Sequence, residues 1–153
     1  MQRRVAMSFA LTTRWLQAGL VLSLLMSGVL MFFPTGPLMT TYNATYEATF
    51  WGGRPLPPEA LRHHAFLMGV TAAGVIGWVV TLWFVVAIPW RKRERWAWHA
   101  VFWGVLAWGG VDLLLCLAFG NVGEAVFASA GAGSLLLPTL LARRHFSTAD
   151  GRR

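Results

Sequence analysis

The sequence predicts an all-α membrane protein in which four helices cross the bilayer as an antiparallel bundle. Of its 153 residues, 56% are hydrophobic and only 12% are charged, whereas a soluble domain carries roughly a quarter charged residues. The apolar residues form four long blocks rather than stripes of helical period, which is typical of helices surrounded by lipid. A chain of this length is expected to form one membrane domain over residues 1–153.

The four apolar blocks cover residues 15–33, 64–88, 96–119 and 122–142. Each is close to the ~20 residues that a helix needs to cross ~30 Å of hydrocarbon. Pro34 follows the first block and Pro89 closes the second. The first block has the basic start of a signal peptide, but its apolar run is too long and no small-x-small cleavage site follows Phe33. It is therefore predicted to be a retained helix.

The distribution of basic residues predicts the orientation. Eleven of the 13 lie before the first block, between the second and third, or after the fourth: Arg3, Arg4, Arg14, Arg91, Lys92, Arg93, Arg95, Arg143, Arg144, Arg152 and Arg153. Only Arg54 and Arg62 lie between the first two blocks. Because cytoplasmic segments are enriched in Lys and Arg, both termini and the 89–95 loop are predicted to be cytoplasmic. The expected location is a bacterial inner (plasma) membrane.

Aromatic residues mark both edges of the predicted bundle. At the cytoplasmic boundary they are expected to lie in the interface: Trp15, Trp90, Trp96 and Trp98. In the extracytoplasmic loop, residues 35–62, Tyr42, Tyr46 and Phe50 recur every fourth position. This spacing predicts a short helix lying in the interface, ended by Gly52 and Gly53.

Small residues recur every fourth position on three of the predicted spans. The stripes are Gly19, Ser23 and Ser27; Gly69, Ala73 and Gly77; and Ala125, Ser129 and Gly133. Small side chains let helix backbones approach closely, which stabilises helix packing in lipid. The stripes are therefore predicted to be contact faces.

Asp112 is the candidate polar ligand or proton site. It lies in the third span, ~10 Å from its outer end, where a carboxylate costs about 2.5–3.5 kcal/mol to insert. It should therefore face the bundle interior, where residues of matching depth are Ser27, Thr71 and Ser129. With no basic residue in that layer, an uncharged carboxyl is favoured. Two interpretations remain open: a proton or ligand site, and an interhelical hydrogen bond that fixes packing.

Four other residues are weaker candidates for the same polar site. Glu124 stands three residues after Asn121, which favours a capping box over a functional role. His63 and His64 open the second span, but adjacent helical side chains point ~100° apart and cannot easily bind one ion. Trp108 lies four residues before Asp112, so it shares its helix face; packing is favoured over a tryptophan-lined pocket.

No residue is assigned as catalytic, cofactor-binding or metal-binding from the sequence. The single cysteine, Cys116, cannot form a Cys-x-x-Cys pair and is expected to be a small apolar residue. A bis-histidine haem between His64 and His99 is excluded because they lie at opposite membrane faces. The net charge of +7 resides in short clusters between apolar blocks, which argues against a nucleic-acid partner and for contact with lipid headgroups.

The layout resembles a broad group of small four-helix bacterial inner-membrane proteins that includes the DoxX-like group. The features that carry the resemblance are Arg62-His63-His64-Ala65-Phe66, the basic turn at 91–98, and Asp112. It is a resemblance of length and layout over the four spans, and it implies no active-site residues. Small multidrug exporters fit poorly because they keep an acid in the first span, where this chain has none.

Three functions remain at this stage. The first, which is favoured, is a non-enzymatic accessory or assembly subunit that contacts other membrane subunits or a second copy of itself. The second is a small-molecule or proton-linked binding or transport module centred on Asp112. The third is a membrane enzyme using His64, Asp112 and Glu124 on a lipid-soluble substrate; a non-enzyme is preferred.

Overall fold

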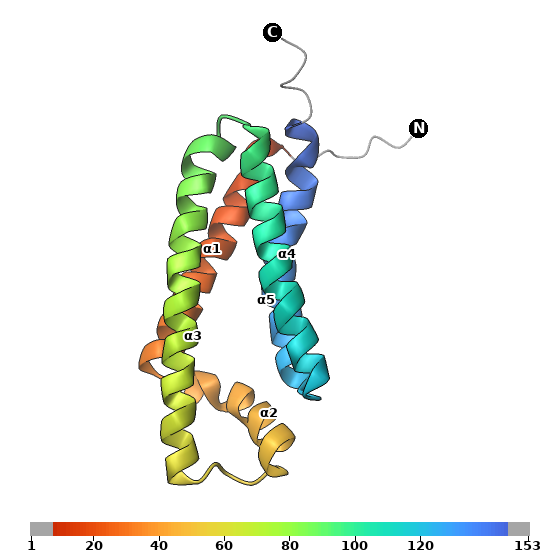
Figure 1. The fold of residues 1–153 in the computed structure, drawn as a ribbon. Helices are drawn as coiled ribbons and strands as arrows, with labels where there is room; N and C mark the ends of the chain where they lie inside the picture. The colour runs from red at the N-terminus through yellow and green to blue at the C-terminus, as the bar shows by residue number, and fades with distance from the viewer. Residues whose placement is uncertain (1–7, 147–153) are drawn as a thin grey trace.

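The computed structural model describes residues 8–146 and is built from helices (Figure 1). Four helices are long and apolar enough to cross a membrane: α1 (Phe9–Phe32), α3 (Pro58–Val85, continued by a π-helical turn at Val86–Trp90), α4 (Arg95–Ala118) and α5 (Val122–Ala142). A shorter helix, α2 (Thr40–Trp51), follows a 3₁₀ turn at Pro37–Met39, and another 3₁₀ turn, Arg143–His145, follows α5. The predicted four-helix bundle and the short helix in the long loop are both confirmed.

Local sequence explains where the helices begin and end. The hydroxyl of Ser8 accepts from the backbone N–H of Leu11 (3.2 Å) and caps α1, so the first helix begins at Phe9 rather than near residue 15. Gly52 ends α2 in the left-handed conformation (φ 62°). Pro58 occupies the first turn of α3, where its missing N–H is not needed.

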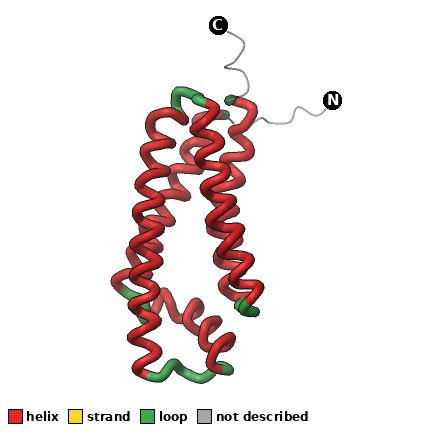
Figure 2. The backbone as a smooth tube through the Cα atoms, viewed as in Figure 1, coloured by secondary structure: helices red, strands yellow, loops and turns green. Residues whose placement is uncertain are grey.

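The two ends of the helix bundle differ in the segments that form them. We call the end that holds the start of α1, the α3–α4 turn and the end of α5 the basic end, and the opposite end, crossed by α2, the α2 end (Figures 1 and 2). Helix α1 contacts both α3 and α5, and α4 packs along α5. In contrast, α3 and α4 separate from each other towards the α2 end. Of the basic residues used to predict orientation, Arg3, Arg4, Arg152 and Arg153 lie outside the described residues.

The tryptophans of the basic end correct one prediction. Trp96 is exposed, as an interfacial residue would be, but Trp90 is 0% and Trp98 is 7% exposed. The indole N–H of Trp90 donates to the hydroxyl of Thr13 (3.0 Å), and that of Trp98 donates to the carbonyl of Thr139 (2.8 Å). Both are therefore core residues, because each bulky ring finds a polar partner on a neighbouring helix.

The small-residue stripes are contact faces on one helix only. On α1, Gly19 faces α5 so closely that a Cβ would lie 2.7 Å from Leu135. On α3, Ala73 and Gly77 are exposed. On α5, Ala125 of the predicted stripe is buried but Ser129 and Gly133 are exposed, and the other small residues facing inwards are Ala128 and Ala132. The prediction for these two helices was wrong because a four-residue spacing does not say which face of a helix meets its neighbours.

Candidate functional site

Helix α2 lies across the end of the bundle and contacts α5. A Cβ added to Gly123 would collide with the side chain of Thr45, so a glycine is needed where α2 crosses the start of α5. The ring of Tyr42 lies 6.0 Å from that of Phe127. Tyr42, one of the aromatic residues predicted to face the membrane interface, therefore packs against α5.

Three potential ligand groups come together under α2. The carboxyls of Asp112 on α4 and Glu124 on α5, and the thiol of Cys116 on α4, have atoms all within 4.8 Å of one another. Cys116 Sγ lies 4.0 Å from Asp112 Oδ1. Asp112 and Cys116 are one helical turn apart and share a face, and the short α4–α5 connection brings Glu124 beside them. We call these three residues the carboxyl cluster.

Tyr42 adds a fourth group to the carboxyl cluster from a third helix. Its hydroxyl acts as a hydrogen-bond donor to the carboxyl of Glu124. Burial, followed by the nearby negative charge of Glu124, raises the pKa of the Tyr42 hydroxyl above its ordinary value. Tyr42 therefore keeps its proton and remains a donor to the cluster.

The side chain of Asn121 caps α5, whereas the side chain of Glu124 does not complete the predicted capping box. Asn121 caps α5, since its side-chain oxygen accepts from the backbone N–H of Glu124 (3.1 Å). The reciprocal half of a capping box is missing, because the backbone N–H of Asn121 donates to the carbonyl of Cys116 (2.8 Å). The carboxyl of Glu124 is thus free to face Tyr42 and Asp112.

The partners expected for Asp112 by depth are not the groups found beside it, which are Cys116 and Glu124. The hydroxyl of Ser27 donates to the carbonyl of Ser23 in its own helix (2.8 Å), and Thr71 and Ser129 are exposed. Cys116 and Tyr42 are the members of the site that sequence reasoning missed. The spacing of Asp112 and Cys116 was an available signal, whereas nothing in the sequence specifies that α2 folds back over α5.

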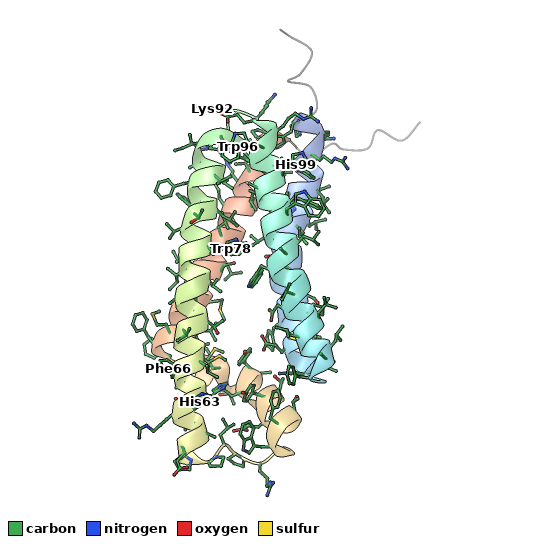
Figure 3. The ribbon with its side chains drawn as sticks, viewed as in Figure 1. His63, Phe66, Trp78, Lys92, Trp96 and His99 are labelled. Atoms are coloured by element: carbon green, nitrogen blue, oxygen red, sulfur yellow. The ribbon has the colours of Figure 1, made fainter. Side chains whose placement is uncertain are left out.

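The two histidines of α3 have different environments. His63 is exposed, and His64 is 3% exposed. His64 Nε2 lies 3.1 Å from Asn43 Oδ1, and its ring lies 4.5 Å from the ring of Tyr46. His64 therefore joins residues of α2 rather than the carboxyl cluster. Figure 3 shows His63 at the α2 end and His99 at the basic end, as expected from the sequence.

Trp108 contributes to a small apolar pocket between α3 and α4. Its ring lies 5.2 Å from that of Trp78. The two indoles line a pocket of about 230 Å³ together with Thr71, Gly74 and Val75. Asp112 stands one helical turn beyond Trp108 on the same helix, towards the α2 end. The pocket and the carboxyl cluster are thus neighbours along α4.

The carboxyl cluster has the chemistry of a proton or cation site. Two carboxyls, a thiol and a phenol supply oxygen and sulfur atoms, and residues 96–142 contain no arginine or lysine to neutralise them. The three ligand atoms within 4.8 Å are spaced so that small side-chain movements would let them contact one metal ion. Two carboxyls this close repel each other when both are ionised, and the repulsion is stronger in a medium of low dielectric.

The chain was compared with protein-family models, curated proteins and solved structures, and none of them matches it. Its four long apolar helices are those of a small four-helix membrane protein, and no family is identified. The chain is therefore a polytopic membrane protein in contact with the lipid bilayer.

Proposed function

We propose that this protein is a proton-linked binding module in which Asp112 and Glu124 share a proton that can be exchanged for a small protonatable solute. The observation that carries the proposal is the convergence of both carboxyls and the Tyr42 hydroxyl from three helices. Like charges at this separation repel strongly in a medium of low dielectric. One proton bound between the two carboxyls relieves the repulsion, and a positively charged solute would do the same.

The pocket beside Trp108 gives such a solute a place to bind. It is apolar, and it lies between two helices that diverge towards the α2 end. A lipid-soluble molecule could therefore reach it from the bilayer. Protonation of the carboxyl pair would release a cationic solute, and deprotonation would favour its binding. No bond other than that to the exchanged proton is made or broken.

The proposal is tested with Asp112→Asn and Glu124→Gln, which keep side-chain shape and remove one ionisable group each. Purified protein is followed by infrared difference spectroscopy between neutral and alkaline pH, a range in which ordinary carboxyls are already ionised and only a proton retained by the pair gives a carbonyl band that is lost. In vesicles, the collapse of an imposed pH gradient is followed with a trapped dye. Both variants should lose the band and slow the collapse by roughly tenfold or more, in line with the size of single proton-transfer contributions.

Glu94→Gln is the matched control, because Glu94 is an acid at the basic end and outside the carboxyl cluster. It should behave like the unmodified protein in both measurements. The proposal fails if Asp112→Asn folds normally and keeps both the carboxyl band and the rate of gradient collapse.

We propose an accessory or assembly role as the second candidate. It is supported by the exposed face of α3 that carries Ala73 and Gly77, where the small side chains leave the backbone accessible to another helix. Replacing Gly77 by Leu should then reduce co-purification of a partner subunit or of a tagged second copy from native membranes. Recovery of the unmodified protein only as a free monomer would count against this role.

A membrane enzyme using His64, Asp112 and Glu124 together is the least supported candidate. His64 is held by Asn43 and Tyr46, and the group of metal- and proton-binding side chains found around Asp112 contains no histidine among residues 8–146. An acid–base mechanism needs its groups within reach of one substrate atom, which this arrangement does not supply.

A further inference from the structure

A second, polar pocket lies at the α2 end, away from the carboxyl cluster. Its volume is about 280 Å³, and it is lined by Thr35, Thr40, Asn43, Ala44, Glu47, Leu56, Leu61 and His64. It is bounded by α2, by the start of α3 and by the residues that precede α2. The hydrogen bonds of its polar lining determine which chemical groups it can bind.

Three side-chain donors of the lining, on Thr40, Asn43 and His64, are already used inside the protein. The hydroxyl of Thr40 donates to the carbonyl of Pro37 (2.9 Å), and the amide nitrogen of Asn43 donates to the carbonyl of Pro34 (2.9 Å). The amide oxygen of Asn43 therefore faces His64, so Nε2 of the imidazole must carry the hydrogen of that contact. Three potential donors are thereby committed.

Besides the hydroxyl of Thr35 and the second N–H of Asn43, the lining has unused hydrogen-bond acceptors. With its hydrogen on Nε2, His64 has a lone pair at Nδ1, and this buried atom has no partner among the described residues. Glu47 accepts only a long contact from the backbone N–H of Leu56 (3.4 Å). Arg54 and Arg62, the basic residues of the 35–62 segment, are both exposed, and Arg54 Nε donates to the carbonyl of Trp51. Within residues 8–146, Glu47 has no ion-pair partner.

We propose that this pocket binds a primary ammonium group. An ammonium supplies three donors and one positive charge, and it has no acceptor. The pocket offers the complement: the negative charge of Glu47 and unused lone pairs on Glu47 and Thr40. The source of the ammonium is either the headgroup of an ethanolamine phospholipid or a free small amine. The proposal does not depend on the function proposed for the carboxyl cluster, since it involves none of those residues.

The proposal is tested with two phospholipids that have the same charge and acyl chains and differ in whether the headgroup nitrogen carries N–H donors. The full-length protein is purified from vesicles made of phosphatidylethanolamine and phosphatidylcholine in equal amounts with identical acyl chains, and retained lipid is counted by native mass spectrometry. A trimethylated nitrogen keeps its positive charge but has no N–H. The unmodified protein should therefore retain the ethanolamine lipid by roughly tenfold over the choline lipid, since charge-assisted hydrogen bonds are the stronger class.

Glu47→Gln should abolish this preference, and Glu59→Gln should leave it unchanged, because Glu59 lies in the first turn of α3 and outside the pocket. Thr40→Val is a second variant, which should weaken the preference without removing a charge. Equal retention of the two lipids by the unmodified protein would exclude a lipid headgroup as the source of the ammonium. A Glu47→Gln protein that folds and remains selective would overturn the proposal.

The same protein in phosphatidylcholine vesicles is then titrated with ethanolammonium chloride and with tetramethylammonium chloride. If the pocket takes a free amine, the first salt should raise the melting temperature, the second should not, and Glu47→Gln should remove the difference. If the ligand is a headgroup, lipid selectivity should be present without any effect of either salt. Absence of both selectivity and a thermal shift would refute binding of a primary ammonium from either source.

Discussion

The basic end and the α2 end use aromatic and polar residues in opposite ways. At the basic end, Trp90 and Trp98 are buried and each gives its indole N–H to one defined acceptor, Thr13 or Thr139. At the α2 end, α3 and α4 diverge, and polar groups such as Glu47 and His64 Nδ1 keep unused hydrogen-bonding capacity. Satisfied groups stabilise a single arrangement, whereas unsatisfied ones leave capacity for a ligand.

Trp90→Ala is the substitution expected to destabilise the basic end most. Trp90→Ala removes a fully buried ring that contacts Phe9 and Phe146, and it should lower the free energy of unfolding by about 3–5 kcal/mol. Trp96→Ala, at an exposed tryptophan of the same end, should change it by less than about 0.5 kcal/mol. Equilibrium unfolding in detergent measures both. Equal effects would mean that the basic end is not the stable core of the bundle.

A substitution at Gly123 tests whether α2 is held on the bundle by close packing. Gly123→Val should push Thr45 away and destabilise the docking of α2 by about 1–3 kcal/mol, the usual cost of overpacking. Hydrogen exchange should then rise over residues 40–51 and stay unchanged at the basic end. Gly133→Val on the same helix, where a Cβ meets nothing within 4 Å, is the control. Uniform exchange throughout the chain would contradict this view of α2.

The smallest effect is expected from pH. Because the pKa of Tyr42 is raised in the folded state, folding favours the neutral phenol. Its contribution to stability is complete below the unfolded pKa of ~10 and falls by up to about 1.4 kcal/mol per pH unit above it. Tyr42→Phe lacks this dependence, so the two stability curves should converge as pH rises from 9 to 11. Parallel curves would show that Tyr42 is accessible to water and ionises normally.

The four spans could be predicted from the sequence because the bilayer core offers no water to satisfy an exposed backbone. The same argument says nothing about which face of each helix meets its neighbours. Trp90 and Trp98 were therefore expected in the interface, and the Ala73 and Gly77 face was expected inside the bundle. Both expectations were drawn from residue type. Which residues are buried depends instead on how each helix is rotated about its own axis.

The candidate site was predictable only in part. Asp112 was identified because a carboxyl inside a span is costly and must find partners. Glu124 was assigned to helix capping, since the local pattern with Asn121 explained it without reference to the rest of the chain. Its neighbours Tyr42 and Cys116 were missed because the position of α2 depends on the fit of Thr45 against Gly123, a contact between residues far apart in the sequence.

The tight link between α4 and α5 has a consequence for how the chain enters the bilayer. Only residues 119–121 separate the two helices, which is too short a connection for them to insert independently. Asp112 and Glu124 therefore cross the headgroup region as one hairpin, already beside each other. We therefore expect the proximity of the two carboxyls to lower the cost of carrying Asp112 into hydrocarbon, since a polar partner enters with it.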